Sequence, residues 1–198
     1  MRSTRRVMMP PLLLTITATT GRSHQPRIRK FLTAAHQILH PPLAELSVAL
    51  VGDRRMGQLH QEFMNIPGPT DVLTFPLELD SRGRPTSGEV VVCVPEAVRQ
   101  ARRHGTRVPD ELLLYALHGL LHLCGFDDRT EADFSAMHAQ EDSILSRLGV
   151  GRVFAPTLPG PADPVARKTA PRRPAHSPKR PPGRAPRRAP HPARRGPA

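Results

Sequence analysis

The chain has 198 residues and a formal net charge of +12, but this charge is unevenly distributed. Residues 155–198 hold 13 of the 24 prolines, 11 of the 29 lysines and arginines, and a single acid. Residues 1–154 therefore carry a charge of only about +2, which excludes a uniformly basic domain. The absence of tryptophan and the single tyrosine disfavour an aromatic platform on which nucleic-acid bases stack.

The composition predicts one domain with two appendages. Residues 12–154 are long enough for a single domain with its own core and too short for two ordinary ones. Residues 1–11 are expected to form a ragged basic start. Residues 155–198 show no apolar periodicity, so burial cannot offset their ordering entropy, and we expect a disordered basic tail.

The two cysteines, Cys93 and Cys124, form no disulfide framework, which suits a reducing cytoplasm. No stretch approaches the roughly 18–20 apolar residues of a membrane span, so no membrane is expected as a partner. The arginine pair Arg5-Arg6 before a leucine run superficially resembles an export signal, and a transit peptide is a second possibility. The short run, broken by prolines and followed by alternation, favours a strand instead.

Periodicity predicts the elements in chain order. Strands are expected at residues 12–17, 46–51, 72–75 and 89–94, and helices at 26–39, 54–63, 95–104, 111–123 and 131–148. Asp53 and Asp110 are expected to be N-caps, and residues 81–87 to be a polar loop. This order predicts an α+β domain with a mixed sheet of about four strands and about five helices.

Residues 118–128 read HGLLHLCGFDD and contain the sharpest motif of the chain. His118 and His122 are four residues apart on the predicted helix, so their imidazoles share one face and can reach one metal ion. Gly125 permits the chain to turn back, because glycine tolerates positive φ. Asp127 or Asp128 can then supply a third ligand, and the spacing favours Asp128.

Three protein ligands leave one coordination position open for water, which is typical of catalytic rather than structural zinc. Two imidazoles and a carboxylate also suit Ni or Fe, so the pattern does not identify the metal. The sequence therefore predicts a metal site at the end of a buried helix, with one Zn²⁺ per chain as the expected ion.

Histidines at this spacing also occur as hydrogen-bonded core residues that bind no metal. The glycine and the paired aspartates at the expected offsets favour the metal site. Cys124 is interpreted as a small buried side chain rather than a ligand, and His104 and His138 as surface or packing residues.

Gly119 argues against a protease. Metalloproteases of the HExxH class carry a glutamate base directly after the first histidine, where this chain has Gly119. A glycine within a helix costs about 1 kcal/mol relative to alanine. We therefore expect Gly119 to serve either close packing or substrate access.

Three segments together resemble the YbeY family of metal-dependent single-strand endoribonucleases and rRNA maturation factors. Residues 118–128 resemble its HGxLHLxGYDH signature. Residues 69–76, which read PTDVLTFP, are similar to its PTDVLSFP segment, and residues 88–92, GEVVV, to its GDIVI strand. The resemblance runs over about residues 12–150 and leaves out the tail.

The resemblance implies hydrolysis of phosphodiester bonds in single-stranded RNA, with roles in rRNA maturation and ribosome quality control in the cytoplasm. The implied partners are rRNA and a ribosomal subunit or assembly proteins. The expected metal-binding and catalytic residues are His118, His122 and Asp128, with Asp127 orienting a ligand and Thr70 and Asp71 shaping the cleft wall.

Two positions depart from the family pattern. Asp128 stands where the family has a third histidine, and its negative charge makes a bound ion less Lewis-acidic. Met64 stands where the family's LNxxYR segment has an arginine thought to face the substrate phosphate, and a methionine cannot neutralise a phosphoryl oxygen. The arginines that could substitute for it are Arg54, Arg55, Arg99 and Arg102.

A second hypothesis is a non-catalytic, RNA-binding ribosome-assembly factor whose metal is structural. Met64 favours this hypothesis, whereas the open coordination position favours the enzyme. The basic tail either attracts RNA through counterion release or acts only as a solvated extension.

Overall fold

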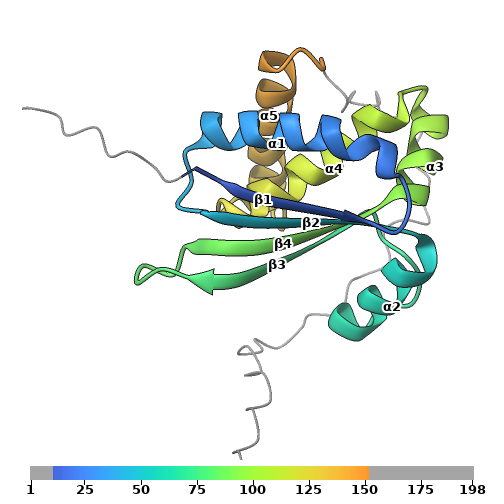
Figure 1. The fold of residues 1–198 in the computed structure, drawn as a ribbon, viewed down its shortest axis with the longest axis horizontal. Helices are drawn as coiled ribbons and strands as arrows, with labels where there is room; N and C mark the ends of the chain where they lie inside the picture. Colours follow the sequence, from blue (N-terminus) through green and yellow to red (C-terminus); the bar gives the residue numbers. More distant parts are fainter. Residues whose placement is uncertain (1–10, 152–198) are drawn as a thin grey trace, which may run out of the picture. The chain divides into compact units, whose positions relative to one another are not determined.

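The computed structural model describes residues 11–151, whose elements follow the order expected from the sequence (Figure 1). The predicted α+β class, with a mixed four-stranded sheet and five α-helices, is confirmed. The tail 155–198 and nearly all of the start 1–11 lie outside the described residues. The elements are β1 (Leu13–Ala18), a 3-10 turn (Arg22–His24), α1 (Gln25–Leu39), β2 (Glu45–Val51), α2 (Asp53–Met64), β3 (Val72–Leu79), β4 (Pro85–Cys93), α3 (Val94–His104), α4 (Val108–Leu123) and α5 (Glu131–Arg147).

The sheet has the strand order β1-β2-β4-β3. The first three of these strands are parallel neighbours, and β3 pairs antiparallel with β4. β4 is therefore a central strand, as its continuous apolar sequence indicates. β3 is an edge strand, which explains why it tolerates Pro76, a residue that cannot donate to a ladder.

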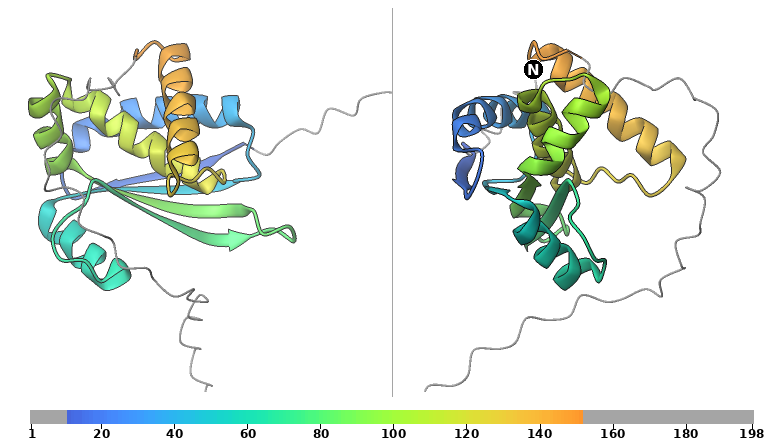
Figure 2. Two further views of the ribbon diagram at one scale, coloured as in Figure 1. Left: turned by 180° about the vertical axis from the view of Figure 1, so that it is seen from behind. Right: turned by 90° about the vertical axis from the view of Figure 1, so that its right-hand side faces the viewer.

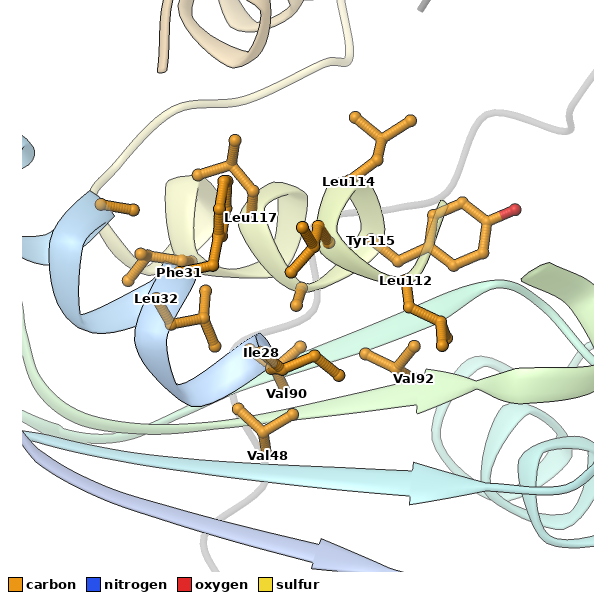
Figure 3. Packing of buried hydrophobic residues seen from close by; sticks show 14 of the residues in the cluster. Ile28, Phe31, Leu32, Val48, Val90, Val92, Leu112, Leu114, Tyr115 and Leu117 are labelled. Carbon is orange, nitrogen blue, oxygen red and sulfur yellow. The ribbon is translucent and has the colours of Figure 1, made fainter. Parts of the chain in front are cut away.

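Alternation along β4 divides the core between the two faces of the sheet. Val90 and Val92 face the larger cluster, which α1 and α4 cover (Figure 3). Val91 and Cys93 point the other way, into a smaller cluster to which α2 contributes Met56 and Leu59. Figure 2 shows α2 on the opposite side of the sheet from α1 and α4.

Helix α4 is the centre of the larger cluster. Eleven of its sixteen residues are buried, which agrees with a sequence that is apolar nearly all round. α1 packs across it through Ile28, Phe31 and Leu32, and the sheet lies beneath it (Figure 3). Among residues 11–151, no helix has both the length and the apolar character that crossing a membrane requires.

Both predicted aspartate N-caps are wrong, by one residue at Asp53 and by three residues at Asp110. α2 has Gly52 at its N-cap and α4 has Arg107, so Asp53 and Asp110 lie within the first turns. There they still favour the helix by complementing its dipole. Pro109, in the first turn of α4, is the signal that marks the earlier start, because proline suits the first helical positions.

The β3–β4 hairpin is longer than predicted from the sequence. β3 continues beyond the predicted 72–75 to Leu79, which pairs with Pro85, so the expected loop 81–87 shrinks to a tight turn. Leu77 and Leu79 continue the alternation that begins with Leu73, but both are exposed, and Pro76 interrupts the pattern. Pairing with β4 keeps this end of the strand extended.

Gly119 allows α4 to approach the sheet closely. A Cβ atom at this position would lie 2.6 Å from Val90 Cγ1 and 3.0 Å from Thr74 Oγ1. Of the two roles expected for this glycine, close packing is the one that these distances support.

The substitution Gly119→Ala tests this packing. Alanine gains helix propensity, but overpacking should lower the free energy of unfolding by about 1–3 kcal/mol. Gly57→Ala in α2 is the control, because its Cβ would meet no atom closer than 3.6 Å, and it should be neutral or stabilising by up to about 1 kcal/mol. Urea denaturation measures both variants, and equal stability would contradict the close approach.

Candidate metal centre

The C-terminus of α4 turns back on itself in a way that its sequence specifies. Gly125 has φ +92°, as expected from the motif. Its N–H donates to the carbonyl of His122 at 3.0 Å, and the N–H of Phe126 donates to the carbonyl of Leu121 at 3.1 Å. These are the two bonds of a Schellman motif, which requires the left-handed conformation that glycine adopts readily. The turn places residues 126–128 beside the last turn of the helix.

His118 and His122 point their Nε2 atoms toward each other. Their Nε2 atoms are 3.0 Å apart and their rings stand nearly perpendicular. His118 Nδ1 lies 2.8 Å from a carboxylate oxygen of Glu141, and His122 Nδ1 lies 3.1 Å from the carbonyl of Phe126. Because both partners are acceptors, the hydrogen-bond network assigns a hydrogen to each Nδ1 and leaves each Nε2 with a lone pair.

Two lone pairs at this distance repel unless a positive centre lies between them, and a metal ion meets that need. The carboxylate of Asp128 approaches the same point, with Oδ2 at 3.8 Å from His118 Nε2. The three ligand atoms lie within 4.8 Å of one another. Zinc bonds of ~2.0–2.1 Å in a tetrahedron separate ligand atoms by about 3.3 Å, so this donor set fits a divalent ion. The structure thus brings the three predicted ligands together.

Glu141 on α5 holds the imidazole of His118 in place. Its side chain has no exposed surface, and its two oxygens lie 2.8 Å from His118 Nδ1 and 2.5 Å from His138 Nδ1. A buried carboxylate is costly unless it is paired, and these two rings supply its partners. A carboxylate behind a ligating histidine fixes the ring orientation and raises its basicity.

The charges around His118 favour a cation at its ring. Burial alone lowers the pKa of His118, but the hydrogen bond and charge of Glu141, together with the charges of Asp71 and Asp128, raise it above the ordinary value. Protons and metal compete for the same nitrogen, so metal affinity should begin to fall at a higher pH than for an unperturbed histidine.

A cavity of about 670 Å³ opens over the donor set. Four carboxylate residues and one arginine, Arg129, are among the side chains that line it. The lining residues that the structure describes therefore give the cavity an excess of negative charge before an ion binds. The lining carboxylates are Asp71, Asp127, Asp128 and Glu141.

The residues expected around the ligands take different positions. Asp71 lines the cavity, and its Oδ1 accepts from Thr70 Oγ1 at 2.9 Å and from the Val72 N–H at 2.8 Å. Thr70 is not among the lining residues, and its hydroxyl instead orients the carboxylate of Asp71. Asp127 accepts from the backbone N–H of Asp128 at 2.9 Å, so it orients the loop that carries that residue.

Met64 lines the cavity, as expected for the position of the family's arginine. None of the four arginines considered as substitutes lines it. Arg99, for example, pairs with Asp53 at 2.7 Å and with Glu96 at 2.6 Å. The arginine that does line the described cavity, Arg129, directly follows Asp128 and pairs with Asp127 at 3.1 Å.

Two residues of the candidate centre, His138 and Glu141, are not predicted from the sequence. The sequence predicts a surface or packing role for His138, but this residue lines the cavity and binds Glu141. The only sequence signal for this pair is a histidine and a glutamate three residues apart on one amphipathic helix.

Cys124 is half-buried and outside the donor set, and burial raises the pKa of its thiol to about 12, which disfavours the thiolate that metals bind.

Comparison with known proteins agrees with this arrangement. The family model described as endoribonuclease YbeY matches residues 17–149. The chain belongs to the YbeY family. A curated relative named endoribonuclease YbeY, from Thermobifida fusca, is 44% identical over 112 residues, which are 53% of this chain and 72% of the relative. One of the same name from Micrococcus luteus is 39% identical over 121 residues, 58% of this chain and 77% of the relative.

A solution structure from Thermotoga maritima is 26% identical, with a TM-score of 0.48 over 69% of this chain and 91% of that chain. The YbeY match spans every residue of the candidate centre, from Met64 on α2 to Glu141 on α5. The family resemblance expected from the three motifs is therefore confirmed.

Zinc should stabilise the folded chain if the three donors bind it. At 100 times the dissociation constant, binding adds about 2.7 kcal/mol to the free energy of unfolding, or several degrees of Tm. Differential scanning fluorimetry with added Zn²⁺ measures this shift. His118→Ala and His122→Ala should abolish it, whereas His104→Ala, at an exposed position on α3, should keep it. A shift that survives in His118→Ala would place the metal elsewhere.

The role of Glu141 is tested by Glu141→Gln, which preserves shape but removes the charge and one of the two acceptors. Loss of such an outer partner should weaken zinc binding about 10- to 100-fold. Competition with a chromogenic chelator measures the affinity, and circular dichroism checks that the variant is folded. Unchanged affinity in a folded variant would show that Glu141 does not support the metal ligand.

Proposed function

We propose that this protein is a metal-dependent endoribonuclease that cleaves single-stranded RNA in rRNA maturation. The observation that carries the proposal is the convergence of His118, His122 and Asp128 at the floor of an open cavity, in a chain of the YbeY family. Zn²⁺ is the proposed ion, and Ni or Fe would suit the same donors. A divalent ion held there supplies a Lewis acid and lowers the pKa of a bound water.

The chain's own residues have separate tasks in this proposal. Glu141 fixes the ring of His118, and the Phe126 carbonyl fixes that of His122. Asp127 orients the backbone at Asp128. Arg129 supplies the cation nearest in sequence to the metal ligands, on the wall that a phosphate would approach.

Charge explains why the binding of RNA within the cavity should require the metal. A phosphodiester is an anion, and among residues 11–151 four carboxylate residues and one arginine line the cavity. Substrate approach is therefore unfavourable until a divalent ion neutralises part of this charge. The metal would serve both substrate binding and chemistry.

A non-catalytic assembly factor is the function that these observations disfavour. The curated relatives of this chain carry the name of an endoribonuclease. The donor set lies in an open cavity rather than in a closed structural site. Ribosomal subunits or assembly proteins remain proposed partners, and the cytoplasm remains the proposed compartment, in keeping with two unpaired cysteines. The charge of residues 155–198 would add sequence-independent attraction for rRNA.

The direct test is cleavage of a labelled single-stranded RNA by zinc-loaded protein. The wild type and the control His104→Ala should cleave it, and His118→Ala should lose activity about 100-fold or more. A chelator should abolish the wild-type activity, and added Zn²⁺ should restore it. Binding without cleavage by the metal-loaded wild type would support the assembly factor, and equal activity in His118→Ala would refute metal catalysis at this site.

Met64→Arg tests the missing cation. Its side chain is 42% exposed on the cavity wall, so an arginine can be placed there without burying its charge. A charge-assisted hydrogen bond to phosphate is worth about 1.5–3 kcal/mol, so kcat/KM should rise about tenfold or more. Steady-state kinetics at two salt concentrations measure the gain, which salt should reduce. No gain at low salt would show that this position does not face the phosphate.

A further inference from the structure

Phe134 is a large apolar side chain exposed on the wall of the cavity that contains the donor set. Its residue is 43% exposed, and it lines the cavity together with His118 and Asp128. It lies in the first turn of α5, whose start is fixed by Thr130, the N-cap that accepts from the Asp133 N–H at 3.1 Å. The helix therefore presents the ring at a defined place beside the metal centre.

The ring is tied to the metal ligands through a short chain of contacts. Phe134 and His138 form a T-shaped pair, with ring centroids 4.0 Å apart and planes at 75°. His138 binds Glu141, and Glu141 binds His118. Such anchoring lowers the conformational entropy that the Phe134 side chain would lose when a ligand contacts it.

We propose that Phe134 is a base-stacking subsite for a nucleotide next to the scissile phosphate, an inference that rests on the proposed function. An aromatic face binds the face of any base and needs no hydrogen-bond readout. The cavity volume of about 670 Å³ lies within the range of roughly 300–1,000 Å³ that is typical of small-molecule pockets. The low aromatic content disfavours a platform of several rings but is compatible with one.

The rest of the cavity has the matching chemistry. Met64 and Pro76 provide apolar lining, and methionine makes favourable contacts with aromatic rings. Asp128 and the two histidines provide the polar floor. This combination of an apolar wall with a metal-binding floor suits a nucleotide, which joins a flat, weakly polar base to an anionic phosphate.

Stacking on Phe134 also explains how the site could select single strands. In a duplex both faces of a base are covered by its neighbours, so the base is not available to a protein ring. A subsite of this kind discriminates against duplex RNA without reading the base sequence.

The test uses the zinc-loaded full chain and a single-stranded oligoribonucleotide with one mapped cleavage site. Two further substrates carry an abasic residue on one side or the other of the scissile phosphate. Phe134→Ala should raise KM about tenfold with kcat nearly unchanged. Phe134→Leu, which keeps apolar bulk but lacks the ring, should show most of this loss. Phe63→Ala is the control, because Phe63 is 53% exposed but does not line the cavity.

The abasic substrates make the test specific. For the wild type, one of them should show the same rise in KM as the Phe134→Ala variant shows with intact RNA. For Phe134→Ala the abasic residue should cause no further loss. Losses that multiply, or a KM within twofold of wild type, would overturn the stacking subsite while leaving nuclease activity intact. A fall in kcat alone would indicate a disturbed His138–Glu141 contact and would also overturn it. A wild type that cleaves no RNA would refute the proposed function and this inference together.

Discussion

The two facing imidazole nitrogens of His118 and His122 impose the constraint on which the rest of the site depends. Their Nε2 atoms lie 3.0 Å apart, while acceptors occupy both Nδ1 positions. In the neutral state two lone pairs meet, which is unfavourable without a cation. Glu141, Asp71 and Asp128 add negative charge around this point, and the pKa of His118 is raised as a result. The fold thus creates one position at which a positive charge is favourable.

The wider architecture holds that geometry. Gly119 lets α4 lie close to β3 and β4, and the Schellman turn at Gly125 returns the chain to the helix. α5 then crosses the end of α4 and brings in Glu141 and Phe134 (Figure 2). Each of these elements is stabilised by burial or by backbone hydrogen bonds. Their summed free energy exceeds that of the repulsion between the two imidazole nitrogens, so the surrounding fold can hold the two rings in this arrangement.

Local sequence predicts the parts of this site that are local in the chain. His118, His122 and Asp128 lie within eleven residues, and helical spacing followed by a glycine turn is enough to bring them together. Glu141 lies 23 residues from His118, and its partnership depends on how α5 packs on α4, which periodicity does not determine. The wrong N-cap predictions have a different cause, because an aspartate suits both an N-cap and the first turn of a helix. In the first turn, Asp53 forms an ion pair with Arg99 and Asp110 forms one with Arg27.

The departures at Asp128 and Met64 act on the same quantity, the net charge of the cavity. Both leave the site more negative than the family pattern, and Arg129 offsets this only in part because it pairs with Asp127.

The central claim is that two imidazoles and one carboxylate share a single divalent ion. X-ray absorption spectroscopy of the zinc-loaded full chain tests it most directly. We predict only nitrogen and oxygen neighbours at about 2.0–2.2 Å, with the outer scattering of two imidazoles. A sulfur neighbour at about 2.3 Å, or the signature of a single imidazole, would contradict it.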